Sequence, residues 1–144
     1  MDEEMNERLK ALHEKIDGHI RKEGVSLMAV PGFIYTIGNA ERGLPELLIM
    51  GNFDPNITGL ALNHLTAKMV EDGESLKTGL VDIDWSHPFK VRRASIRAQK
   101  EYTIQANVRV GHELYTVLQV MICDRNGVYP GEPNCHPDFD VELV

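Results

Sequence analysis

The chain has 144 residues, of which 42% are hydrophobic and 26% are charged, a composition that argues for a folded globular domain and against disorder. The net charge of −7 argues against general nucleic-acid binding, because attraction to the phosphate backbone needs clustered Lys and Arg. No apolar run approaches the roughly 18 residues that span a bilayer, and no basic start precedes an apolar stretch. We therefore expect a cytoplasmic protein with no membrane partner.

Two helices are well marked by their ends. Apolar residues at steps of three and four predict a helix over residues 3–23 that ends at Gly24. A second helix is expected to begin at Pro55, with Asp54 as its cap, and to end before Gly73. The apolar face expected for this second helix consists of Ile57, Leu60, Ala61, Leu65 and Met69.

Strands are predicted wherever β-branched, aromatic and apolar residues gather between turn residues. Six segments meet this description: residues 25–30, 33–38, 46–51, 76–85, 89–96 and 113–124. Pro31 and Gly32 form a type II turn pair, which predicts an antiparallel hairpin of the first two strands. The segment 46–51, which is apolar after Glu46, and the long segment 113–124 are typical of strands at the centre of a sheet.

A third helix is predicted from Gln99 to Val110, and the proline-rich tail from about residue 128 is expected to be irregular. Strand segments occur in pairs joined by short turns, with helices inserted between the pairs. This order predicts one α+β domain over residues 1–144. We expect a mainly antiparallel sheet with an N-terminal helix and one or two further helices packed on it.

Two stretches carry a resemblance to a known family: "FIYTIGNAERGLPELLIMGN", residues 33–52, and "LQVMICDRNGVYP", residues 118–130. The chain resembles the bacterial and phage family catalogued as domain of unknown function 4262, over roughly residues 16–132. The positions that match the family pattern are Phe33, Tyr35, Thr36, Ile37, Gly38, Pro45, Glu46, Gly51, Gln119, Asp124, Gly127 and Pro130. The resemblance also relates His19 to a histidine near the end of the first helix. It implies no activity, because the family has none assigned.

The first candidate site lies in the earlier of these stretches. On a strand, Tyr35 and Thr36 point to opposite faces of the sheet. In a structural interpretation Tyr35 packs in the core and Gly38 makes a turn. In a functional interpretation the loop 38–45 rims a pocket, with Glu46 at its base as a hydrogen-bond acceptor or acid/base group. The sequence leaves both open.

The second candidate is a cluster of basic residues in an acidic chain. Five of the fifteen basic residues fall within eleven positions: Lys90, Arg92, Arg93, Arg97 and Lys100. They could protect a solvated edge strand from aggregation. They could also form an anion pocket, because the guanidinium fork of Arg pairs with phosphate or carboxylate.

Metal and nucleophile sites have weak signals. Cys123 and Cys135 are expected to be reduced thiols, and with His136 they lack the spacing of a zinc site. We therefore predict no metal and no cofactor.

The leading hypothesis is a protein that binds or sequesters a small anionic, nucleotide-like molecule. Its expected ligand-binding residues are Tyr35, Thr36, Gly38, Glu46, Arg92, Arg97, Gln119 and Asp124. One alternative is a hydrolase that uses Glu46, His19 or Asp124 as acid/base groups. Another is an inhibitor or immunity protein that binds another protein through its acidic first helix. The oligomeric state is open, with a two-fold homodimer as the commonest assembly.

Overall fold

The computed structural model describes residues 2–111 and 115–144. The strands in chain order are β1 (Ser26–Val30), β2 (Phe33–Ile37), β3 (Glu46–Met50), β4 (Gly79–Val81), β5 (Phe89–Arg93) and β6 (Val117–Met121). The helices are α1 (Glu3–Glu23), α2 (Pro55–Asp72), α3 (Ile96–Tyr102) and α4 (Ile104–Val110), with a 3₁₀ turn η1 (Ala40–Arg42) between β2 and β3.

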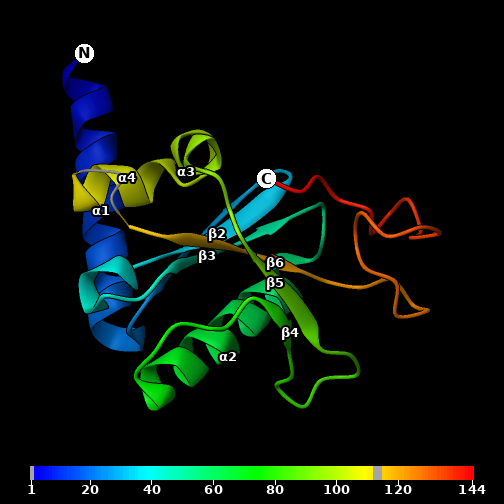
Figure 1. Cartoon of the computed structure of the whole chain (residues 1–144). Helices are drawn as coiled ribbons and strands as arrows, with labels where there is room; N and C mark the ends of the chain where they lie inside the picture. The colour runs from blue at the N-terminus through cyan, green and yellow to red at the C-terminus, as the bar shows by residue number, and fades with distance from the viewer. Residues whose placement is uncertain (1, 112–114) are drawn as a thin grey trace.

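The six strands form one sheet in the order β1-β2-β3-β6-β5-β4. All neighbouring strands are antiparallel except the central pair β3 and β6, which are parallel. As Figure 1 shows, α2 covers one face of the sheet, while α1, α3 and α4 lie on the other. The predicted α+β class with a mainly antiparallel sheet is therefore confirmed, and so are the central places of β3 and β6.

The predicted helix ends are also confirmed. The side chain of Asp54 accepts a hydrogen bond from the amide of Asn56 at 2.9 Å, and Pro55 occupies the first turn of α2. Gly73 follows the helix at a φ of 69°, a left-handed conformation in which glycine avoids the strain of a Cβ atom. Each end thus satisfies main-chain groups that the helix leaves unpaired.

The fourth strand is shorter than expected, because β4 covers only Gly79–Val81 of the predicted segment 76–85. After it, the carboxylate of Asp82 accepts a hydrogen bond from the amide of Asp84 at 2.9 Å. Asp84 also takes a positive φ of 63°. This local turn competes with the sheet ladder and ends the strand.

The predicted third helix is two helices. The chain turns helical at Ile96, three residues early, because the hydroxyl of Ser95 accepts a hydrogen bond from the amide of Ala98 at 3.1 Å. It then breaks at Thr103, whose hydroxyl donates to the main-chain oxygen of Gln99 at 2.8 Å. Such a bond bends a helix by drawing the carbonyl outward.

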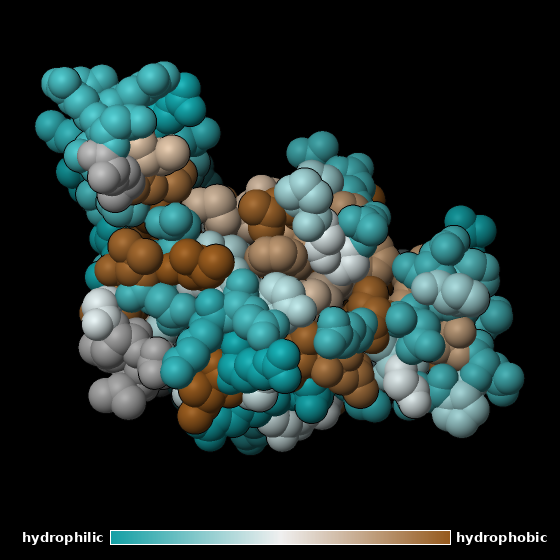
Figure 2. All heavy atoms as spheres, turned by 90° about the horizontal axis from the view of Figure 1, so that it is seen from above, coloured by the Kyte–Doolittle hydropathy of each residue, from teal (hydrophilic) through white to brown (hydrophobic). Residues whose placement is uncertain are grey.

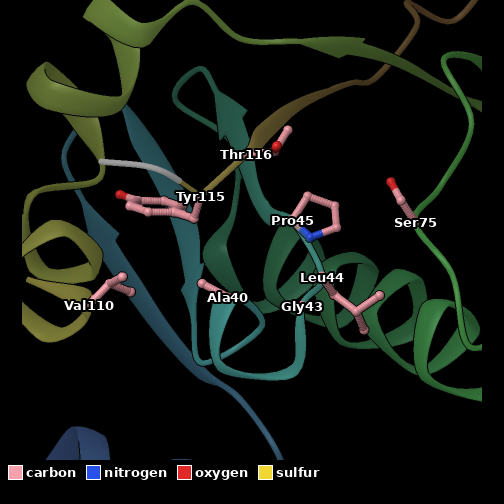
Figure 3. Close-up of a pocket in the computed structure, with 8 residues that line it drawn as sticks. All are labelled: Ala40, Gly43, Leu44, Pro45, Ser75, Val110, Tyr115 and Thr116. Carbon is pink, nitrogen blue, oxygen red and sulfur yellow. The ribbon is translucent and has the colours of Figure 1, made fainter. Parts of the chain in front are cut away.

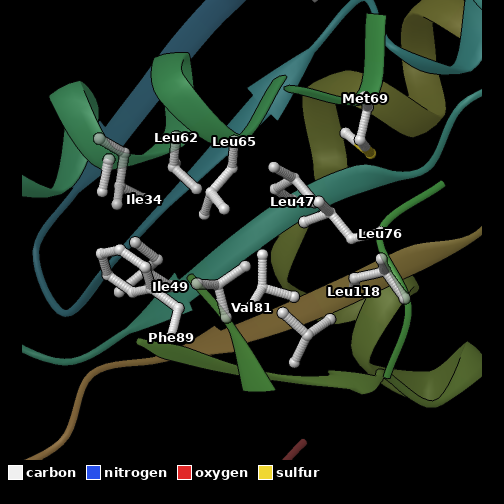
Figure 4. Close-up of a cluster of buried hydrophobic side chains, with 13 residues drawn as sticks. Ile34, Leu47, Ile49, Leu62, Leu65, Met69, Leu76, Val81, Phe89 and Leu118 are labelled. Atoms are coloured by element: carbon white, nitrogen blue, oxygen red, sulfur yellow. The ribbon is translucent and has the colours of Figure 1, made fainter. Parts of the chain in front are cut away.

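Each face of the sheet carries its own hydrophobic core. The core under α2 is drawn in Figure 4 and contains Ile34, Leu47, Ile49, Ala61, Leu62, Leu65, Met69, Leu76, Val81, Phe89, Val91, Leu118 and Val120. The core under α1, α3 and α4 contains Ile16, Tyr35, Ile37, Leu48, Met50, Ala94, Ala98, Ala106, Tyr115 and Val117. The alternation of side chains along β3 supplies both, which is why its residues 47–50 are all apolar.

The apolar face predicted for α2 is partly wrong. Ile57 and Leu60 are about half exposed, at 55% and 50%, whereas Leu62 is fully buried. Near its N-terminal end the helix buries the small residues Thr58 and Gly59. Gly59 allows close approach, because a Cβ atom there would lie 3.1 Å from Leu27 Cδ1. Because small residues form the contact, the helix buries a different face from the one that hydrophobicity alone predicts.

Beyond β6, residues 122–144 contain turns and bends without a helix or strand. Among the described helices, we find none with the length and apolar character needed to cross a membrane.

Replacing Leu62 with Ala should lower the free energy of unfolding by about 2–5 kcal/mol, the usual cost of a cavity at a buried leucine. The matched control Leu60→Ala should cost well under half as much, because its side chain is 50% exposed. Urea denaturation measures both. Equal effects would contradict the orientation of α2.

Candidate functional site

The carboxylate of Glu46 lies at the start of β3 and is fully shielded from solvent. Its Oε1 accepts hydrogen bonds from the Thr36 hydroxyl at 2.7 Å and the Asn39 amide at 3.2 Å. Its Oε2 accepts from the amides of Gly38 at 3.1 Å and Ala40 at 3.0 Å. Burial raises the pKa of Glu46, while these four donors favour the charged form and oppose the rise. The loop after β2 is thus wrapped around a buried acid.

Thr36 and Asn39 extend this network to the next elements. The Thr36 hydroxyl accepts a hydrogen bond from the amide of Leu47 at 2.8 Å. The side-chain nitrogen of Asn39 donates to the hydroxyl of Thr66 on α2 at 3.1 Å, and both residues are almost fully buried. The network therefore joins β2, β3 and α2 through buried side chains and the main-chain amides that they bind.

Tyr35 points to the opposite face from Thr36, as expected, and is only 2% exposed. Its hydroxyl accepts a hydrogen bond from the amide of Gln105 at 3.1 Å. That amide lies in the first turn of α4, where main-chain donors have no partner within the helix. The geometry of Tyr35 is that of a residue that docks α4 onto the sheet.

The loop that Glu46 organises does border a hollow of about 360 Å³. The lining residues, shown in Figure 3, are Ala40, Gly43, Leu44, Pro45, Ser75, Val110, Tyr115 and Thr116. Glu46 is not among them, because its carboxylate turns inward to the loop amides. The expected position of Glu46 at the base of the pocket is therefore wrong. The lining has hydroxyl groups and no charged side chain.

Arg92 and Gln119 are brought together on adjacent strands. They are register partners of β5 and β6, and Arg92 Nη1 donates to Gln119 Oε1 at 3.2 Å. Gln119 is also in register with Leu48, which in turn pairs with Tyr35. Three of the predicted site residues thus share one row across the sheet, although Tyr35 is covered by α4.

Residues 142–144 lie against the side chains of Arg92 and Gln119. Gln119 Nε2 donates to the main-chain oxygen of Glu142 at 2.7 Å, and the amide of Val144 donates to Gln119 Oε1 at 2.9 Å. Arg92 Nη1 donates to the main-chain oxygen of Val144 at 2.8 Å. Residues 142–144 therefore act as a wall over the two side chains.

A polar hollow of about 390 Å³ opens beside this wall. It is lined by Arg92, Ser95, Arg97, Ala98, Glu101, Tyr102, Glu142, Leu143 and Val144. Arg97 is largely exposed and pairs with Glu101 at 2.8 Å. Lys90 instead pairs with Glu132 at 3.6 Å. Of the five clustered basic residues, Arg92 and Arg97 therefore face one shared hollow.

Asp124 lies apart from both places, in the turn after β6. Its Oδ1 accepts from the amides of Asn126 and Val128, both at 2.9 Å, and its Oδ2 accepts from the amide of His136 at 2.9 Å. The hydrogen bonds from Val128 and His136 hold the pKa of Asp124 below its ordinary value. The geometry shows a side chain that ties the tail to the turn.

The predicted residues thus fall into three groups: Tyr35, Thr36, Gly38 and Glu46; then Arg92, Arg97 and Gln119; then Asp124. His19, named for the hydrolase alternative, is exposed and contacts Ser26 Oγ at 3.3 Å. In the described ranges, no three His, Cys, Asp or Glu side chains are grouped as metal ligands.

Sequence reasoning missed Asn39, Ser95, Glu142 and Val144. A signal existed for Ser95, since Ser followed by a helix-forming run is typical of a helix start. Nothing local in the sequence marks the docking of residues 142–144 on Gln119.

Replacing Glu46 with Gln should lower the free energy of unfolding by roughly 2–4 kcal/mol, because the new NH₂ group would face main-chain donors. The exposed control Glu71→Gln should change it by less than about 0.5 kcal/mol. Thermal and urea unfolding test this. An unchanged midpoint for E46Q would restore the functional interpretation of this carboxylate.

Protonation of Asp124 should release the tail. Because its pKa is lower in the folded chain than in the unfolded one, its ionised form stabilises the fold above pH about 4, and this is lost as the pH falls further. The amide of His136 should then lose hydrogen-exchange protection in acid. In D124N that protection should be low at neutral pH already, whereas E71Q, which changes an exposed carboxylate on α2, should behave like the unaltered chain. Full protection in D124N would contradict the tether.

Comparison with known proteins bears on the family alone. Neither the curated proteins nor the solved structures contain a match to this chain. The family described as "Domain of unknown function (DUF4262)" matches residues 19–136, which includes the Glu46 loop, the Arg92–Gln119 pair and the Asp124 turn. The chain therefore belongs to the DUF4262 family.

Proposed function

We propose that this protein binds a small anionic, nucleotide-like molecule in the polar hollow beside Arg92 and Arg97. The observation that supports the proposal most is that two guanidinium groups of an acidic chain line the same hollow, next to Ser95. Guanidinium forks suit phosphate and carboxylate groups. Glu101 and Glu142 also line this hollow, and Arg97 pairs with Glu101 at 2.8 Å, so an anionic ligand would take the place of that pairing.

The ligand-binding role proposed from sequence is thereby narrowed to Arg92, Arg97 and Gln119. Gln119 holds Arg92 in place, because its side-chain oxygen accepts a hydrogen bond from Arg92. Tyr35, Thr36, Gly38 and Glu46 would contribute indirectly, by fixing the sheet and the neighbouring helix. A cytoplasmic location, a bacterial or phage setting and a two-fold homodimer belong to the same proposal.

The hydrolase alternative has less support. An acid/base group must reach the substrate. The carboxylates of Glu46 and Asp124 are both occupied by main-chain donors. His19 contacts Ser26 on the edge strand β1, which β2, β3 and β6 separate from Arg92 on β5.

The alternative of an inhibitor or immunity protein that binds another protein through its acidic first helix also has less support. On the face seen from above in Figure 2, hydrophobic side chains form small groups bordered by hydrophilic ones. Larger continuous apolar patches are what usually mark protein interfaces.

Isothermal titration with a nucleoside diphosphate and with a tricarboxylate tests the proposal. Binding should weaken as salt rises from about 50 to 200 mM, because this site is partly open to solvent. R97Q should weaken it about tenfold, corresponding to one lost charge-assisted hydrogen bond. The control R21Q makes the same charge change on α1 and should have little effect. Equal losses in both variants, or salt-independent binding, would contradict this site.

A further inference from the structure

The side-chain amide of Gln119 binds a stretch of main chain as a neighbouring strand would. Its NH₂ group donates to the oxygen of Glu142 at 2.7 Å, and its oxygen accepts from the amide of Val144 at 2.9 Å. These contacts reach alternate residues and involve only main-chain atoms of the bound segment. They therefore suit any extended peptide, whatever its side chains.

Two further donors meet at one main-chain oxygen of this segment. Arg92 Nη1 donates to the oxygen of Val144 at 2.8 Å, and the amide of Ser95 donates to it at 3.3 Å. A bond from a charged guanidinium is stronger than one between neutral groups. Arg92 lies on β5 and Gln119 on the central strand β6, so the receiving surface is built into the sheet and not onto a flexible loop.

The side chains of the segment make distinct contacts. Val141 and Val144 pack against the core beneath α1, α3 and α4. Gly51 makes room for the segment, because a Cβ atom there would lie 2.9 Å from Val141 Cγ1. Glu142 lines the same hollow as Arg97 and Tyr102. The pKa of Arg97 is raised chiefly by its hydrogen bond with Glu101 and the pKa of Tyr102 chiefly by burial, and the charge of Glu142 adds to both shifts. The segment thus places an acidic side chain where an anion is proposed to bind.

The segment is attached to the rest of the fold through irregular chain. Residues 122–140 contain turns without a helix or strand, and Glu142 and Leu143 are exposed. Figure 1 shows this part of the chain extending away from the sheet before its end returns toward α3. Release of residues 141–144 therefore requires no helix or strand to unfold.

We infer that the surface of Arg92, Ser95 and Gln119 is a peptide-binding site, and that residues 141–144 are its resident, exchangeable occupant. The external ligand is an extended acidic peptide of a partner protein, with the order apolar, acidic, any residue, apolar. This inference rests on the proposed anion site and adds a second anion that the site accepts, a side-chain carboxylate. The resident segment lowers the apparent affinity for the partner, because it must leave first.

The test uses a variant that lacks residues 141–144 and a fluorescent peptide of sequence Asp-Val-Glu-Leu-Val. Fluorescence anisotropy should show saturable binding to the variant, at least about tenfold tighter than to the full chain. The same peptide with Gln in place of Glu should bind about tenfold more weakly, the loss of one charge-assisted bond. A nucleoside diphosphate should compete with the acidic peptide.

The outcomes separate the two proposals. If the nucleotide binds and the peptide does not, the peptide inference fails and the anion site stands. If neither binds, both fail. Equal binding of the Glu and Gln peptides would overturn the acidic specificity. A dimer that disappears on removal of residues 141–144 would overturn the partner assignment, because the occupant would then be a second copy of this segment.

A second variant covers the case in which the shortened chain does not fold. E142Q in the full chain keeps the main-chain contacts of the segment and removes only its charge, so the acidic peptide should bind more tightly than to the unaltered protein. D138N removes a charge from the tail outside the hollow and should bind the peptide like the unaltered protein. Identical affinities for E142Q and D138N would overturn the inference.

Discussion

The burial of one carboxylate determines much of this fold. Glu46 is removed from water at the start of a central strand, which is costly unless its oxygens are fully hydrogen-bonded. The chain meets that requirement by turning three successive amides, those of residues 38–40, toward it. The turn shape between β2 and β3, and with it the rim of the neighbouring hollow, follows from this single group.

A second polar contact, made by Gln119, holds residues 142–144 against the sheet. Gln119 occupies a core position on the central strand β6, yet its amide is satisfied by the main chain of residues 142 and 144. A buried amide without partners would destabilise the sheet, so the position requires an extended segment above it. A peptide that replaced residues 142–144, as proposed above, would satisfy the same atoms of Gln119.

Much of the architecture could be predicted from local patterns. Asp54, Pro55 and Gly73 mark both ends of α2, and the apolar run of β3 indicates a strand covered on both faces. The break at Thr103 could not be predicted, because it depends on a hydrogen bond from the Thr103 hydroxyl to the main-chain oxygen of Gln99. The predicted burial of Leu60 on α2 was also wrong, because the orientation of the helix depends on its close approach to Leu27 at Gly59.

The candidate site was less predictable than the fold for a related reason. The Tyr-Thr-Ile-Gly stretch and Glu46 do act together, but a sequence cannot show whether a carboxylate turns toward solvent or toward its own loop. The members of the basic cluster also have different partners, which the sequence does not show. Lys90 pairs with Glu132, whereas Arg92 donates to the main-chain oxygen of Val144. Such choices depend on contacts between residues that are far apart along the chain.

The parallel pairing of β3 with β6 has a consequence for how the protein is made. During synthesis, β1, β2, β3 and α2 emerge well before β6, so the apolar edge of β3 waits without its neighbour. Closing such a distant pair is slow, and an unpaired apolar strand is prone to aggregate. Until β6 has been translated, the edge of β3 that β6 will cover is therefore open to pairing with another chain.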